Sequence, residues 1–380
     1  MPRGYTKKAT SSCRLPFAKA AVGDIIALVK YKMKRESQPA VTRRSPLLYG
    51  SAVLLLRLGL RFLSRTHEEI PSSLFMMQRQ GYRFLYVGLH KSLWETSGVQ
   101  TVLHRNRLTV PYAAMGDNLV HGRFFQAIAK KLGIFLVKRA VGREGLLESA
   151  ASLKREIQAH LRERIDVLVF PEGTRKNIPQ HGRYGTFFTT VFEAALELSQ
   201  EGEKVLLVPV NVDYSHVRED HEMLGAKERH PRTLHILDSL NMLSHLDDIF
   251  VSIGDPIVPG DRQWNRKDLA AHCHRACLDL IKILPINIVA WAIHSLLQKN
   301  ERDAGSLYRE IEANIMALSP FHERFRGFGL SCQGQVLFET VAGKRKEFRL
   351  WAEKKPEPLA LFKLYRDYIG HLIPVETHPA

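Results

Sequence analysis

The chain has 380 residues, 45% of them hydrophobic, so it is long enough to bury a sizeable core in one or two domains. Its formal net charge is +16, and residues 1–65 hold most of it, with fourteen Lys/Arg against two Asp/Glu. A basic segment of this kind can bind nucleic acid or an anionic lipid surface. Because the basic residues form no named nucleic-acid-binding motif, we expect no nucleic-acid partner.

The first 71 residues form a basic, amphipathic lead-in that we expect to associate with membranes. Residues 51–63 combine a dense apolar face with Arg57 and Arg61. This pattern is typical of a helix lying in a membrane interface, and equally of an amphipathic helix packed on a domain. No stretch reaches the ~20 consecutive apolar residues that span a bilayer. We therefore expect a cytoplasmic protein attached peripherally to a membrane.

Mitochondrial targeting is the alternative localisation. The first twenty residues are basic, contain Ser and Thr, and lack acidic residues, as mitochondrial transit peptides do.

Apolar runs alternate with helical patterns through the middle of the chain. Strands are predicted at residues 84–89, 111–115, 135–138, 167–170 and 205–212, with a late edge strand at 250–253. Helices are predicted at residues 96–103, 120–132, 144–164 and 186–199. The alternation predicts an α/β domain over residues 72–262, with a mostly parallel central sheet covered by helices. Residues 1–71 and 263–380 are expected to form helical N- and C-terminal extensions.

The first of these strands runs directly into His90, and Glu95 follows five residues later. Open α/β sheets place their ligands beyond the carboxyl ends of strands. Five positions on one helix are rotated ~140° apart at 3.6 residues per turn. The two side chains can therefore meet only if His90 lies in the loop and Glu95 on the first turn of the next helix. Taken alone, the stretch is read more simply as a strand-end histidine paired by chance.

Such a pair would have a definite chemistry. A carboxylate on one imidazole nitrogen fixes the tautomer and makes the other nitrogen a better base. That base could deprotonate a substrate hydroxyl directly, without an enzyme nucleophile. Ser92 lies close to His90, but the chain has no Gly-x-Ser-x-Gly elbow, so a serine hydrolase is not expected.

Three further blocks follow the histidine block, at residues 133–139, 165–175 and 205–212, and the second contains Phe-Pro-Glu-Gly-Thr-Arg. In this order the four blocks resemble the glycerolipid acyltransferase family, whose first motif is His, four residues, then Asp. The resemblance spans roughly residues 84–256. Glu95 replaces the family's Asp and is longer by one methylene, so the loop must shift to keep the hydrogen bond. Ser-His-Glu triads show that this replacement is chemically workable.

The resemblance implies acyl transfer from a thioester to an alcohol, with His90 as the base and Glu95 as its partner. Arg175 is the best candidate for the acceptor phosphate, because a guanidinium can grip phosphate with two hydrogen bonds. Ser92 and Pro209 are expected to shape loops at the site. The substrate-binding residues that the resemblance implies are Lys138, Arg139, Glu172, Gly173, Thr174 and Arg175.

No metal site and no bound cofactor are expected, and acyl-CoA or acyl-carrier protein would serve as co-substrate. Cys273 and Cys277 lie near two histidines in a segment that reads as helical, where the side chains of consecutive residues point apart, and no second ligand pair follows at the spacing of a zinc finger. We expect them to be structural.

The resemblance leaves the acyl acceptor open between two branches of the family. Residues 284–290 and 361–371 resemble the glycerol-3-phosphate and dihydroxyacetone-phosphate branch, whereas residues 170–175 resemble the lysophosphatidate branch. We expect an enzyme of phospholipid biosynthesis that acylates a hydroxyl of glycerol 3-phosphate at an anionic membrane surface. The alternatives are a lysophospholipid (1-acylglycerol-3-phosphate) acyltransferase and a non-catalytic lipid-binding relative.

Overall fold

A computed structural model describes ten stretches of the chain. These are residues 44–45, 47–51, 65–92, 94–117, 122–137, 143–175, 177–217, 219–224, 248–352 and 359–374. Most of the predicted basic extension, including nearly all of the predicted interfacial helix at 51–63, lies outside them. Within the described residues, no helix combines the length and the apolarity needed to cross a bilayer.

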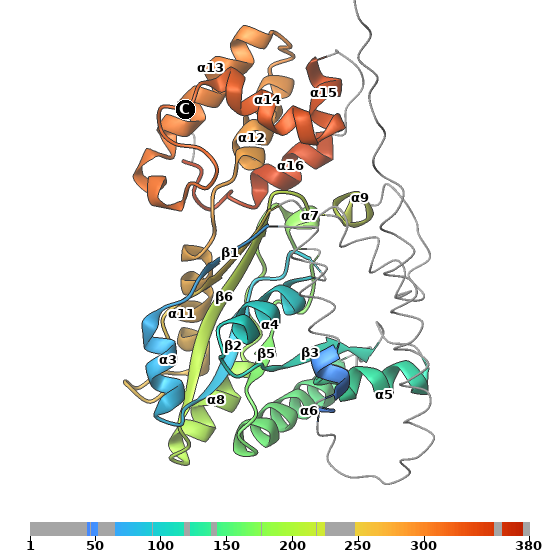
Figure 1. Ribbon diagram of the computed structural model, residues 1–380, viewed down its shortest axis with the longest axis vertical. Coiled ribbons are helices and arrows are strands. Elements are labelled where there is room, and N and C mark those ends of the chain that lie inside the picture. Colours follow the sequence, from blue (N-terminus) through green and yellow to red (C-terminus); the bar gives the residue numbers. More distant parts are fainter. Residues whose placement is uncertain are drawn as a thin grey trace, which may run out of the picture.

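A seven-stranded sheet forms the centre of the molecule, in the order β1-β7-β6-β2-β5-β3-β4 (Figure 1). Every neighbouring pair is parallel except β6 and β7. The prediction of a mostly parallel sheet is confirmed. The strands are β1 (Arg65–Glu69), β2 (Arg83–Gly88), β3 (Tyr112–Gly116), β4 (Ile134–Val137), β5 (Val167–Val169), β6 (Val205–Tyr214) and β7 (Asp248–Ile253).

Helices between the strands cover this sheet, as predicted. α4 packs against β6 and β7, whereas α6 contacts β2, β4 and β5, and α8 packs against both α6 and β6. The helices of this part are α3 (Ser72–Arg79), α4 (Glu95–Arg105), α5 (Arg123–Lys131), α6 (Arg143–Arg162), α7 (Asn177–His181), α8 (Thr190–Gln200) and α9 (Asp220–Met223). No helix was predicted where α7 lies.

β1 differs from the prediction, which placed residues 65–69 in the basic extension. Its sequence, RTHEE, is mostly charged, and its side chains are only exposed or half-buried. Its strand conformation comes from parallel pairing with β7, which hydropathy does not reveal. As a result β7 lies inside the sheet, between β1 and β6, and is not the edge strand that was predicted.

The C-terminal part is helical, as predicted, and most of it gathers at one end of the sheet (Figure 1). α11 instead packs along β2 and β6. The division into three domains stays a prediction. The helices here are α11 (Arg266–Asp279), α12 (Pro285–Gln298), α13 (Ala304–Ala317), η2 (Ser319–Arg324), α14 (Gly334–Lys344), α15 (Lys346–Ala352) and α16 (Leu359–Asp367).

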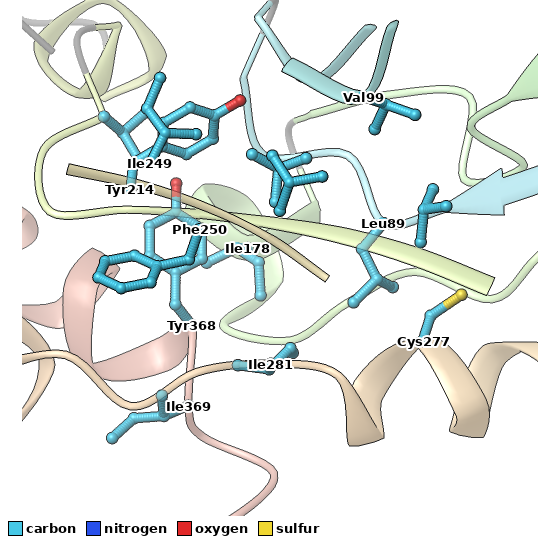
Figure 2. Close-up of a cluster of buried hydrophobic side chains, with 14 of the residues drawn as sticks. Leu89, Val99, Ile178, Tyr214, Ile249, Phe250, Cys277, Ile281, Tyr368 and Ile369 are labelled. Atoms are coloured by element: carbon cyan, nitrogen blue, oxygen red, sulfur yellow. The ribbon is translucent and has the colours of Figure 1, made fainter. Parts of the chain in front are cut away.

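The sheet and the C-terminal helices share one apolar core. Figure 2 shows Leu89, at the end of β2, in the same buried cluster as Ile281 and Ile369, which follow α11 and α16. Cys277 also belongs to this cluster, and its Sγ donates to the Val87 carbonyl at 3.3 Å. The end of β2, where the candidate base lies, is therefore held by the C-terminal part as well as by its neighbouring strands.

Candidate active site

His90 and Glu95 meet beyond the carboxyl end of β2. The His90 Nδ1 and Glu95 Oε2 atoms lie 2.7 Å apart, and the side chains are 20% and 1% exposed. Glu95 is the first residue of α4, which is the arrangement that their spacing required. The proton on Nδ1 faces the carboxylate, which leaves Nε2 as the basic nitrogen.

The second carboxylate oxygen of Glu95 fixes the loop between the two residues. Glu95 Oε1 accepts the backbone N–H of Ser92 at 2.6 Å, and it also accepts the N–H of Lys91. The longer glutamate therefore keeps the imidazole bond while serving as an internal acceptor for its own loop. A buried carboxylate whose two oxygens both accept hydrogen bonds is a rigid support for a base.

Glu172, in the loop that follows the neighbouring strand β5, holds the backbone of His90. Its Oε1 accepts the His90 N–H at 3.0 Å, and its Oε2 accepts from Asn177 Nδ2 at 2.9 Å and Gly185 N–H at 2.7 Å. Burial raises the pKa of Glu172, and the three hydrogen bonds act against that rise. Glu172 therefore ties the histidine loop to the loop that follows β5, and both of its carboxylate oxygens accept hydrogen bonds within the protein.

Phe170 and Gly88 set the position of the imidazole ring. The rings of His90 and Phe170 stack with centroids 4.9 Å apart and planes at 16°. A Cβ on Gly88 would come within 2.9 Å of Val210 Cγ2 and 3.1 Å of the Phe170 ring. Glycine is required at this strand end because any side chain would push the stacked rings away from β6.

Arg175 and Ser92 meet at a buried carboxylate that the sequence analysis did not identify. Ser92 Oγ lies 3.0 Å from both oxygens of Glu219, and Arg175 Nη1 lies 3.6 Å from Glu219 Oε1. Arg175 Nη1 is buried and has no hydrogen-bond partner among the described residues. The predicted phosphate-binding arginine is thus joined to the histidine loop through Glu219, and its Nη1 group can still donate a hydrogen bond to a ligand.

The remaining predicted residues differ in how the structure places them. Lys138 and Arg139 lie outside the described residues. Gly173 has φ +67° and donates its N–H to the Phe170 carbonyl at 3.0 Å, so it makes a left-handed turn. Thr174 follows in the same loop, between Gly173 and Arg175. Pro209, which was expected to shape a loop, lies within β6, paired with Val87.

Lys91 is a second residue that the sequence analysis missed, although it directly follows His90. Its Nζ is buried, donates to Asn211 Oδ1 at 2.8 Å and pairs with Asp213. Both partners lie on β6, which extends past the end of β2. Adjacency to the histidine was the signal that could have identified Lys91. Glu219 gave no such signal, because it lies in a charged stretch without periodicity.

The backbone N–H groups beside His90 and at Gly173 could in principle stabilise an oxyanion, but they are occupied in this structure. The N–H groups of His90, Lys91 and Ser92 bind Glu172 and Glu95, and that of Gly173 closes a turn. These groups therefore organise the loops around the base, and stabilisation of a developing oxyanion would need other donors.

A buried charged network joins the C-terminal helices to this edge of the sheet. Asp220 Oδ2 accepts from Tyr365 Oη at 2.8 Å and Arg345 Nη2 at 2.9 Å, and Tyr365 Oη also accepts the Val217 N–H at 3.0 Å. Asp220 is the residue after Glu219, so helix α16 fixes the segment that carries the carboxylate beside Arg175.

Comparison with known proteins gives a family match across the sheet. A protein-family model described as Acyltransferase matches residues 65–213, from β1 to the end of β6. This match confirms the resemblance drawn from the four sequence blocks.

Two curated relatives carry the same printed name, "Glycerol-3-phosphate acyltransferase". The protein from Baumannia cicadellinicola subsp. Homalodisca coagulata is 25% identical over 244 residues, covering 60% of this chain and 29% of that protein. The one from Hamiltonella defensa subsp. Acyrthosiphon pisum (strain 5AT) is 25% identical over 209 residues, covering 52% and 24%. The chain thus matches less than a third of the length of these relatives.

One solved structure is similar over much of the chain. It is the crystal structure of the 1-acyl-sn-glycerophosphate (LPA) acyltransferase PlsC from Thermotoga maritima, at 16% identity and a TM-score of 0.40. The similarity covers 69% of this chain and 90% of that one.

Proposed function

We propose that this chain is a glycerolipid acyltransferase that moves a fatty acyl group from an acyl thioester to a hydroxyl of glycerol 3-phosphate. The observation that carries this proposal is the 2.7 Å contact of His90 Nδ1 with the buried Glu95 carboxylate at a strand end. A non-catalytic relative would have no need to keep this pair intact and fixed by further hydrogen bonds.

The proposed step needs no enzyme nucleophile. As the acceptor oxygen attacks the thioester carbonyl, His90 Nε2 takes the hydroxyl proton and Glu95 stabilises the imidazolium that forms. The C–O bond forms, the C–S bond breaks, and the proton passes to the departing thiolate. General-base catalysis of this kind typically contributes ~100- to 10,000-fold in rate.

Arg175 is proposed to bind the phosphate of the acceptor. Its Nη1 is buried without a hydrogen-bond partner in the described part of the chain, and a phosphate oxygen would satisfy that donor. Glu219 holds the guanidinium at 3.6 Å and keeps it near the histidine loop. We include Lys138, Arg139, Gly173 and Thr174 in the substrate site on the family resemblance.

Two observations favour glycerol 3-phosphate over a lysophospholipid acceptor. The curated relatives are glycerol-3-phosphate acyltransferases by name. The two C-terminal segments that resemble that branch also contact each other near the site, with Asn287 Nδ2 donating to the Tyr365 carbonyl at 2.8 Å. Tyr365 in turn binds Asp220, next to Glu219.

We further propose that the protein works at an anionic membrane surface to which it is peripherally attached. The charge balance of residues 1–65 supports this, since polybasic segments are attracted to anionic lipids. Mitochondrial targeting remains the alternative to a cytoplasmic location. No metal and no bound cofactor enter the proposed reaction.

The test is acyl transfer by the purified protein in liposomes. Labelled acyl-CoA and acyl-carrier protein would be offered as donors, with glycerol 3-phosphate or lysophosphatidate as acceptor. His90→Ala and Glu95→Asp would be measured beside the wild type.

Each outcome has a separate meaning. Turnover that is lost in His90→Ala would support the proposal, and the preferred acceptor would select the branch. Activity that appears only in Glu95→Asp would favour a degenerate site with a lipid-binding role. Turnover that His90→Ala leaves unchanged would overturn the mechanism.

A further inference from the structure

The loop that carries His90 is attached to both strands that flank β2. In the sheet, β2 lies between β5 and β6. On the β5 side, Glu172 Oε1 accepts the His90 N–H at 3.0 Å. On the β6 side, the residue after His90 is Lys91, whose Nζ donates to Asn211 Oδ1 at 2.8 Å and forms an ion pair with Asp213. One side chain therefore fixes the loop to each neighbouring part of the sheet.

Asn211 and Asp213 can both face Lys91 because they lie two positions apart on one strand, where side chains point to the same face. The pairing of β6 with β2 ends at Gly88 and Val210, so both residues belong to the part of β6 that extends past the end of β2. Asn211 Nδ2 donates to Asp213 Oδ2 at 2.6 Å, which holds the two side chains together. The strand thus presents a fixed pair of acceptors beside the histidine loop.

The ion pair between Lys91 and Asp213 is almost fully buried, with side chains 2% and 6% exposed. Lys91 Nζ also lies 5.8 Å and 5.9 Å from the ring centroids of Tyr184 and Tyr368. Replacing a buried ion pair by uncharged residues of similar volume is often neutral or stabilising, because both charges must be removed from water. Stability is therefore a weak reason for this pair, and the need for one fixed loop position is a better one.

Lys91 is held at its backbone as well as at its side chain. Its N–H donates to Glu95 Oε1, and the other oxygen of the same carboxylate contacts the His90 imidazole. At the far end of the ion pair, Asp213 Oδ2 accepts the Lys282 N–H at 2.8 Å, in the connection between α11 and α12. A shift of Lys91 would therefore displace Glu95 and His90, and the C-terminal helices help to prevent that shift.

We propose that Lys91 is a positioning residue for acyl transfer, which fixes the histidine loop to β6 through Asp213 as Glu172 fixes it to β5. The inference rests on the proposed function for the reaction that it supports. Because its Nζ is bound to β6, Lys91 acts through His90 and Glu95 and not on the substrate. A catalytic group misplaced by about 1 Å can lose roughly 100-fold in rate, so a modest movement of the loop is enough to lower kcat.

Two variants separate positioning from stability. Lys91→Met keeps a long unbranched side chain but leaves the Asp213 carboxylate buried and unpaired, so we expect the thermal unfolding midpoint to fall by about 5 °C or more. The double variant Lys91→Met/Asp213→Asn leaves no buried charge, and the new amide oxygen can still accept the Lys282 N–H. We expect its midpoint to return to within about 2 °C of the wild type.

Steady-state acyl transfer is then compared between the wild type and the double variant. We expect the kcat of the double variant to stay about tenfold below the wild type, because the histidine loop has lost its attachment to β6. The KM for glycerol 3-phosphate should change by less than about twofold, because Arg175 is paired with Glu219 and not held by Lys91. A double variant with both the midpoint and the kcat of the wild type would overturn the proposal.

Lys282→Met is the matched control. Lys282 is also a buried lysine in an ion pair, but its ammonium group binds Glu69, at the end of β1, and not a residue of β6. We expect a lower unfolding midpoint and an unchanged kcat. A kcat that falls in Lys282→Met as far as in the double variant would mean that the loss of any buried lysine here impairs the site, and would overturn the specific role of Lys91.

Hydrogen exchange tests the same point without turnover. The N–H groups of His90 and Ser92 donate to buried carboxylates, so their exchange rates report how firmly the loop is held. We expect residues 88–94 to exchange about tenfold faster in the double variant than in the wild type, and at the wild-type rate in Lys282→Met. If the wild type transfers no acyl group, the proposed function fails. Equal exchange in the wild type and the double variant would overturn the positioning role whether or not the protein turns over.

Discussion

Two buried carboxylates, Asp166 and Glu172, lie at opposite ends of β5 and differ in how their oxygens are used. Asp166 Oδ1 accepts one backbone N–H, from Phe84 at 2.9 Å, while its Oδ2 is buried without a partner in the described residues. Glu172 accepts three hydrogen bonds, from His90, Asn177 and Gly185.

The contrast shows that the two ends of the paired strands β2 and β5 have different roles. At the amino end, the Asp166 carboxylate contacts only β2 among the described residues, through the Phe84 N–H and through Arg83 Nη1 at 3.8 Å. At the carboxyl end, Glu172 and Glu95 draw donors from several loops and fix them around His90. Open α/β sheets place their ligands at this carboxyl end. We therefore expect changes at the carboxyl end to alter activity and changes at the amino end to alter stability.

The largest effect is expected from Glu95→Gln. The amide keeps the size of the side chain but cannot stabilise the imidazolium, and its NH₂ group would face either the imidazole or the backbone N–H groups. We expect kcat to fall by about 100-fold or more. Steady-state acyl transfer measures this effect, with Asp166→Asn as the buried-carboxylate control. A kcat in Glu95→Gln that matches the control would refute the role of Glu95.

The next effect is a pH dependence of stability caused by Asp166. Burial raises the pKa of Asp166 to about 7, whereas an unfolded Asp titrates near ~3.9. Between these values the unfolded chain loses the proton first, so stability is fully present below about pH 4 and is lost as the pH rises to about 7. The shift corresponds to as much as ~4 kcal/mol.

Asp166→Asn should remove this dependence while leaving activity near the wild-type level. Denaturant unfolding of both proteins at several pH values checks it. The wild type should lose more free energy of unfolding than the variant as the pH is raised from 4 to 7. Parallel curves would show that Asp166 titrates in the same way in the folded and unfolded chains.

The sequence predicted most of the sheet because its central strands are nearly continuous apolar runs, as buried parallel strands are. It missed β1, whose charged sequence forms a strand only by pairing with β7. At the site, the spacing of His90 and Glu95 allowed one geometry, and the structure has it. Glu219 could not be predicted, since it reaches Ser92 from 127 positions away and the segment around it is irregular.

Glu172→Gln is expected to have a smaller effect that combines stability and activity. Any placement of the amide turns one NH₂ group toward a backbone or side-chain donor and leaves that donor unsatisfied. We expect the free energy of unfolding to fall by ~1–3 kcal/mol. We also expect kcat to fall by about tenfold, because His90 keeps its partner Glu95 but its loop is less firmly placed. Lost stability with unchanged kcat would mean that Glu172 only supports the fold.

The smallest effect is expected from Ser92→Ala, which removes the hydroxyl shared by Glu219 and the Trp94 N–H. Glu219 keeps its ion pair with Arg175, so the phosphate-binding arginine should move only slightly. We expect a loss of ~1 kcal/mol in unfolding free energy, a few-fold rise in the KM for the acceptor and a nearly unchanged kcat. Ser73→Ala is the matched control, because it deletes an exposed serine–carboxylate bond, to Asp255 at 2.8 Å. If Ser92→Ala abolished turnover while Ser73→Ala did not, Ser92 would be a nucleophile, and direct attack by the acceptor would have to be replaced by an acyl-enzyme mechanism.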